Sequence, residues 1–256
     1  MEKQNLRSLL EKPIKYAAVA RELTGLSDSV FDATNRNGDS VKNEWVEQAN
    51  VSLRVEAEKV VDDLNDIIAQ VLLDKHVSEF VKDEQLTQSE SAALMRRLKS
   101  IGFTKLMVRY LRDNVDVIVD RLVNLSNNVF VAASTRLVEG LNQQLKEDDE
   151  LSALQIEFEP EILTEKDLLI VGQPLKFHIE LLFADVFSES WFITNVTQAL
   201  STSTSLPATI ELLKARNVTR VVTLASRLKR AAFNVASDAV NRANQQLAEI
   251  NVNVRD

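Results

Sequence analysis

The sequence predicts a mainly α-helical protein, an elongated helical bundle with a small antiparallel β hairpin or meander near residues 153–186 (an α+β chain). Three observations lead to this fold class. Long stretches before residue 146 repeat apolar residues every three or four positions, as one-sided helices do. A middle segment alternates apolar and polar residues, as half-buried strands do. Helical spacing then returns and continues almost to the C-terminus.

The first half of the chain is expected to be helical over about 6–31 and 42–73. In the second stretch the intervals between apolar residues are all three or four, which is typical of one buried helical stripe. That stripe consists of Val46, Ala49, Leu53, Ala57, Val60, Leu64, Ile67 and Val71.

Residues 103–146 are predicted to form the longest helix, about 66 Å at 1.5 Å per residue, or two helices with a break at Ser126–Asn128. Its apolar stripe is longer than one small globule can cover. We therefore expect an elongated bundle or a partner chain, and hence self-association.

The segment 147–187 differs from its neighbours in composition. Leu168 to Val171 form a short apolar run, and Gly172-Gln173-Pro174 is typical of a turn. Alternation predicts strands at 156–158 and 176–183, so that two or three short strands are expected over about 153–186. The alternating apolar residues of the second strand are Phe177, Ile179, Leu181 and Phe183.

Helices are expected again at 188–199 and 207–249, the second with an Ala-rich inner face. That face consists of Val221, Leu224, Leu228, Ala232, Val235, Ala239, Ala243 and Leu247. The expected regions are a helical bundle over 1–146, a β segment over 147–187 and a helical region over 188–256. The last region packs back on the first, or the whole chain forms one domain.

The rare residues exclude several kinds of site. The chain has no Cys and two His, which excludes disulfides, thiolate metal sites and cysteine nucleophiles and argues against multi-histidine metal sites. Its five glycines are isolated, so no phosphate-cradling loop or nucleophile elbow is present. We therefore predict no catalytic residue, metal, cofactor or small-molecule substrate. Apolar runs are too short to span a bilayer, and we expect no membrane association and a cytoplasmic location, or a virion assembled there.

Two motifs have carboxylate or amide ligands at suggestive spacings. Asp62-Asp63-Leu64-Asn65-Asp66 has the DDxxD form that holds magnesium diphosphate, but no second motif of that form accompanies it. Residues 33–44 resemble a calcium-binding loop, except that Ala33 occupies the first ligand position. We expect a solvated helix face and a polar loop that does not bind calcium tightly.

Charge is segregated along the chain, although the net charge is −8. At 100° per residue, one side of the predicted C-terminal helix carries a basic stripe, which consists of Arg216, Arg220, Arg227 and Arg230. The segment 147–167 carries nine acids and one base. The acidic residues expected to interact are Glu147, Asp148, Asp149, Glu150, Glu157, Glu159 and Glu161.

The basic stripe has three interpretations: a solvated face, contact with the acidic segment of the same or a neighbouring subunit, or contact with nucleic-acid phosphates. Together with the long apolar stripes, it favours a non-enzymatic structural or assembly subunit. Such a subunit self-associates or docks with other protein subunits in a larger complex, for example a virion. The alternative is a nucleic-acid-associated protein that uses the Arg stripe. A carboxylate- and magnesium-dependent enzyme is the third hypothesis.

Overall fold

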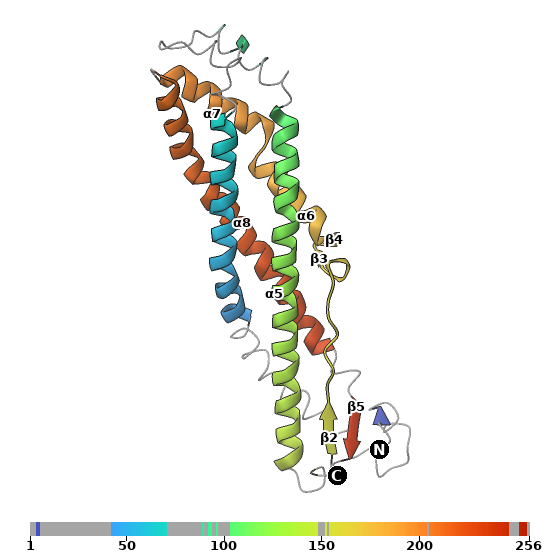
Figure 1. Ribbon diagram of the computed structural model, residues 1–256. Helices are drawn as coiled ribbons and strands as arrows, with labels where there is room; N and C mark the ends of the chain where they lie inside the picture. Colours follow the sequence, from blue (N-terminus) through green and yellow to red (C-terminus); the bar gives the residue numbers. More distant parts are fainter. Residues whose placement is uncertain are drawn as a thin grey trace. The chain divides into compact units, whose positions relative to one another are not determined.

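A computed structural model describes residues 4–5, 42–70, 89, 92, 93, 96, 103–147, 152, 154–203, 205–245 and 251–254 (Figure 1). These residues are mainly helical and include a small antiparallel β hairpin, which confirms the predicted fold class. The chain divides into two compact units. Unit 1 comprises Met1–Ala49, Leu122–Leu168 and Ala232–Asp256, and unit 2 comprises Asn50–Arg121 and Leu169–Ala231. The expected boundaries near residues 146 and 187 stay a prediction.

Two long helices supply the core of unit 1. They are the C-terminal part of α5 (Phe103–Glu147) and the C-terminal part of α8 (Leu206–Gln245). Their buried residues lie on one side of each helix, mostly three or four positions apart, and α8 contributes mostly alanines, which allow close approach of a neighbouring helix. These residues are Leu122, Leu125, Val129, Phe130, Ala133, Leu137, Leu141 and Leu145 of α5, and Ala232, Val235, Ala236, Ala239 and Ala243 of α8. The helix α5 is continuous through Ser126, so the alternative of a break there is wrong.

Unit 1 also contains a three-stranded antiparallel sheet in the order β1-β5-β2. The strand β2 (Leu154–Glu157) is one that alternation predicts. Its partner β5 (Asn251–Val254) comes from the C-terminus, and β1 (Gln4–Asn5) pairs with the other edge of β5 (Figure 1). The sheet therefore joins three segments that are far apart in the sequence.

An extended segment over 156–163, the strap, runs along α5 between two asparagines. The Asn142 side chain donates to the Ile156 carbonyl at 2.9 Å and accepts from the Ile156 N–H at 2.7 Å. Asn127 makes the same two bonds to Leu163, at 2.9 and 2.7 Å. The two asparagines are about 22 Å apart along the helix axis, and seven extended residues span about 23 Å. The strap and helix therefore match in length, and they run in opposite directions.

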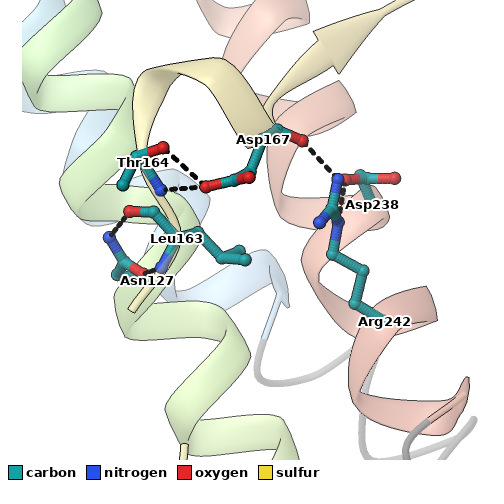
Figure 2. Close-up of polar contacts among 6 residues, drawn as sticks. All are labelled: Asn127, Leu163, Thr164, Asp167, Asp238 and Arg242. Carbon is teal, nitrogen blue, oxygen red and sulfur yellow. Dashed lines mark hydrogen bonds and ion pairs between the residues drawn. The ribbon is translucent and has the colours of Figure 1, made fainter. Parts of the chain in front are cut away.

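The C-terminal end of the strap is tied to α8 (Figure 2). The Thr164 N–H and hydroxyl both donate to Asp167 Oδ2, at 2.7 and 2.6 Å, across the 3₁₀ turn η1 (Glu165–Asp167). The hydroxyl bond, followed by the N–H bond, lowers the pKa of Asp167. Arg242 of α8 donates to the Asp167 carbonyl and to the Asp238 carboxylate, the latter at 2.7 Å. The strap thus links the two long helices of unit 1.

Unit 2 contains helical residues 50–70, the N-terminal parts of α5 and α8, the helices α6 (Leu175–Val186) and α7 (Glu189–Thr202), and a β hairpin. The hairpin pairs β3 (Leu169–Ile170) with β4 (Gln173–Pro174) and directly precedes α6 (Figure 1). Most of the predicted stripe of helix 42–70 is buried, including Leu53, Ala57, Val60 and Leu64, with Ile68 in place of Ile67. Expectations for residues 6–31 lie outside the described residues.

The strand predicted at 176–183 is wrong, because these residues belong to α6. The buried residues of this helix are Leu175, Ile179, Leu182, Phe183 and Val186, a helical spacing. Phe177 and Leu181 are apolar but 47% exposed, on another side of the helix. Two apolar sides on one helix produced the alternation that resembled a strand.

Replacing Asn127 by Ala should lower the free energy of unfolding by about 1–3 kcal/mol, because Leu163 would lose partners for both of its backbone groups. The matched control is Asn128→Ala, since Asn128 is the exposed neighbour on the same helix. Urea denaturation followed by circular dichroism measures both. Equal effects of the two substitutions would contradict the clamping role of Asn127.

Candidate protein-interaction site

Arg220, in the middle of the predicted basic stripe, connects three helices of unit 2. Its guanidinium donates to the carbonyl of Val186, the last residue of α6, at 3.1 Å, and lies 4.6 Å from the centroid of the Trp191 ring of α7. A cation at a helix C-terminus satisfies a free carbonyl and interacts favourably with the helix dipole. Burial, and secondarily the neighbouring Arg227, lower the pKa of Arg220. Arg220 therefore holds α6 and α7 against α8.

Two more residues of the stripe contact the same pair of helices. Arg227 forms an ion pair with Asp185 of α6, and Arg216 donates to the Gln198 side chain of α7 at 3.2 Å. Arg230 is exposed. The structure thus gives three of the four predicted arginines partners within unit 2. Contact of the stripe with the acidic segment stays a prediction.

Aromatic rings reinforce the turn between α6 and α7. Phe183 and Phe187 have ring centroids 6.1 Å apart, and Phe187 meets Trp191 edge-on at 5.9 Å. Such tilted and edge-on contacts are favourable beyond the area that they bury. Since Arg220 covers Trp191, the aromatic row and the stripe form one connected contact between α6, α7 and α8.

The residues of the predicted acidic segment are exposed where the structure describes them. Glu147 ends α5 and accepts from Gln143 at 3.1 Å. Glu157 lies in β2, and Glu159 and Glu161 lie in the strap. Asp148, Asp149 and Glu150 lie outside the described residues. The strap therefore presents its carboxylates to solvent while the Asn127 and Asn142 side chains hold its backbone.

The candidate magnesium motif does not form a metal site in the described part of the chain. Asp63 accepts a hydrogen bond from the Tyr110 hydroxyl at 2.6 Å, whereas Asp62 and Asp66 are exposed. Burial and this bond to Asp63 raise the pKa of Tyr110. Among the described residues no group of three or more His, Cys, Asp or Glu could hold a metal ion. Of the calcium-like loop, residues 33–41 lie outside the described residues, and Glu44 lies in a helix.

Unit 2 exposes apolar residues in pairs one helical turn apart, which we call the apolar pairs. They are Val51 and Val55 of helix 42–70 (69% and 55% exposed), Phe177 and Leu181 of α6 (47% each), and Val218 and Val222 of α8 (60% and 64%). Single exposed apolar residues are ordinary, whereas adjacent ones form patches that favour contact with another protein. The sequence interpretation missed these pairs, although the alternation in 176–183 was a signal for one of them.

The tip of the β hairpin has an unusual conformation. Val171 and Gly172 have φ angles of 53° and 75°, as in a two-residue type I′ turn. Glycine and asparagine adopt positive φ readily, but a β-branched residue does so at a cost. The Val171 side chain is also 91% exposed. The hairpin tip therefore combines a strained backbone with an exposed apolar side chain.

Comparisons with models of known protein families, with curated protein sequences and with solved structures gave no significant match. Within the described residues, no helix is long and apolar enough to cross a membrane. The geometry of the chain's own residues is therefore the basis of the functional proposal below.

Replacing Arg220 by Ala should lower the free energy of unfolding by about 1–2 kcal/mol, because the α6 C-terminus loses its cation and Trp191 its stacking partner. Arg230→Ala is the control, since Arg230 is exposed on the same helix, and its effect should stay within about 0.5 kcal/mol. Urea denaturation measures both variants. A cost for Arg230→Ala as large as that for Arg220→Ala would refute the assignment.

Replacing Val171 by Asn should raise the free energy of unfolding by about 1 kcal/mol, because asparagine tolerates positive φ. Little burial is lost, since the valine is almost fully exposed. Ile162→Asn is the control: Ile162 is 84% exposed, but its φ is not positive. Thermal unfolding of the two variants side by side measures the difference. An equal shift in both would show that strain at Val171 is not the cause.

Proposed function

We propose that the protein is a non-enzymatic structural subunit that assembles with other protein chains through exposed apolar surfaces. The observation that carries this proposal is the set of three apolar pairs on three helices of one compact unit. A component of a virion or of another large protein machine would have this function. The segregated charges of the sequence support the same proposal. The long apolar stripe does not, because Ile118, Leu122 and Leu145 of α5 are buried within the chain itself.

The size of the apolar pairs is suited to association between chains. Burial of an exposed Val, Leu or Phe side chain contributes about 1.5–3 kcal/mol, and less for one that is already half-buried. Association costs at least about 4 kcal/mol in lost translational and rotational freedom. One pair alone is therefore insufficient, and an interface needs apolar residues on both partners. Surfaces with two or more apolar residues each meet that requirement.

The arginine contacts favour assembly with protein over the nucleic-acid alternative. A guanidinium that stacks on Trp191 and bonds to the Val186 carbonyl is not free to bind a phosphate. The charge of Arg227 is neutralised by its ion pair with Asp185. Among the predicted stripe residues, Arg216 bonds to the neutral Gln198 side chain and Arg230 is exposed, so these two arginines are left for a partner. Two arginines give little of the multiple phosphate neutralisation that nucleic-acid binding requires.

Sedimentation velocity of the purified protein over a wide concentration range tests the proposal. We expect larger species to increase reversibly with concentration, because association is driven by apolar burial. Fluorescence anisotropy with labelled DNA and RNA at low and moderate salt is the parallel measurement, and we expect weak binding. A protein that stays monomeric at its highest attainable concentration, and binds nucleic acid with a steep salt dependence, would support the alternative function instead.

A further inference from the structure

Two asparagine side chains form a hydrogen bond inside the core of unit 2. The side-chain amide of Asn217, on α8, donates to Oδ1 of Asn65, on helix 42–70, across 152 residues of sequence. Asn217 is 2% exposed and Asn65 is 8% exposed. The Oδ1 atom of Asn217 is also buried, and it has no hydrogen-bond partner among the described residues. Buried amides are costly unless their groups are bonded, so the presence of this pair in the core requires a physical reason.

The pair interrupts the apolar stripes of the two helices. The residues that flank it on the buried sides are at most 3% exposed: Val61, Leu64 and Ile68 on helix 42–70, and Leu213 and Leu224 on α8. Apolar residues in place of both asparagines would bury more apolar area and would leave no unpaired acceptor. The two asparagines therefore make this core less stable than it could be, and their role is not to stabilise it.

The other polar contacts of helix 42–70 lie at the edge of the core. The Tyr110 hydroxyl of α5 donates to Asp63 at 2.6 Å, and Arg121 of α5 forms an ion pair with Glu56. The Arg121 side chain is 41% exposed, and Asp63 is half-buried. Water can replace the partners of such groups if the helix shifts. The contacts with α5 therefore discriminate less between positions of the helix than the buried asparagine pair does.

Apolar side chains alone determine the position of helix 42–70 along α8 only weakly. Buried Leu, Ile and Val exchange for one another at a modest cost, and both stripes repeat mostly every three or four residues. A shift of α8 by seven residues, about 10 Å, keeps the same side of α8 toward the helix. Such a shift brings Ile210 or Leu224 opposite Asn65 in place of Asn217. Both amides would then be buried without a partner, which is strongly unfavourable.

We propose that the Asn65–Asn217 pair is a conformational device that selects one register of helix 42–70 on α8, at a cost in stability. Buried asparagines in helical cores act in this way, because a polar group that is bonded in one register is left unbonded in the others. The pair penalises the other registers and does not strengthen the native one. This role concerns the fold of a single chain and does not depend on the proposed function.

A double-mutant cycle separates this role from a stabilising one. Asn65→Ala and Asn217→Leu each leave the other amide buried and unpaired, and each should lower the ratio of folded to unfolded protein by about 10- to 100-fold. In the double variant neither amide remains, and the larger leucine fills the volume that the alanine vacates. We expect the double variant to be at least as stable as the unaltered chain. Urea denaturation followed by circular dichroism measures all four proteins.

The number of registers is measured with the two tryptophans of the chain, because Trp45 lies in helix 42–70 and Trp191 contacts Arg220 of α8. In a proton–nitrogen correlation NMR spectrum, the unaltered chain should give one indole N–H signal for each. The double variant should give additional or exchange-broadened signals, and its urea transition should be less steep. Tyr110→Phe is the control: it removes a hydrogen bond at the edge of the core and should keep one signal per tryptophan.

Four results would overturn the proposal. A double variant with one sharp signal per tryptophan and an unchanged urea slope would show that apolar packing sets the register by itself. A double variant less stable than the unaltered chain would show that the pair is retained for stability. Loss of the helical circular dichroism signal in the double variant would contradict the proposal in the same way, since apolar residues should keep these helices folded. Extra signals in Tyr110→Phe would show that loss of any polar contact loosens the helix.

Discussion

The contact of Arg220 with the end of α6 joins three helices of unit 2, and the burial of Leu175, Ile179 and Phe183 sets which side of α6 faces its own chain. The guanidinium binds the terminal carbonyl of α6 and covers Trp191 at the start of α7, so both helices are fixed relative to α8. The ion pair of Arg227 with Asp185 adds a second point along α6. With the helix held in this way, Leu175, Ile179 and Phe183 are buried. Phe177 and Leu181 then remain exposed to solvent.

The predictions that depend on local periodicity agree well with the structure. The helices expected at 103–146 and 207–249 end within a few residues of α5 and α8. Leu224, Leu228, Val235 and the neighbouring alanines are buried as expected, because one side of a helix in a soluble unit must be apolar. The turn at Gly172 was also recognised from its residues. These features depend on neighbours in the sequence, and local patterns are sufficient to predict them.

The prediction for α6 was wrong for an informative reason. A rule based on alternation assumes that an element has one apolar side, and then Phe177, Ile179, Leu181 and Phe183 fit a strand. A helix with apolar residues on two sides gives the same pattern over eight residues. Phe177 and Leu181, on the second side, are half exposed, so alternation alone does not separate a strand from such a helix. The length of the segment did not distinguish a helix from a strand. The turn residues at 172–174 and the break near 187 enclose a segment short enough to be a strand.

Contacts between residues far apart in the sequence could not be predicted from local patterns. Nothing in 251–254 indicates that it pairs with 154–157, and no local pattern shows that Asn127 and Asn142 bind the backbone of the strap. Such asparagines resemble any polar residue on a helix until the extended chain lies beside them. Asn127 and Asn142 can hold both ends of the strap because their separation along α5 matches the length of the extended segment, and that match exists only in the folded chain.

The basic stripe is a charge pattern whose role the sequence alone could not decide. Arg216, Arg220 and Arg227 are used to attach α6 and α7 to α8, which a single sequence cannot distinguish from a surface that awaits a partner. Arg230 continues the run of bases beyond these contacts. Lys214, in the same run, pairs with Glu211 one turn before it, at 3.6 Å. A run of like charges in a sequence is therefore no sign by itself of a surface that binds another molecule, because its members can hold together the helices of their own chain.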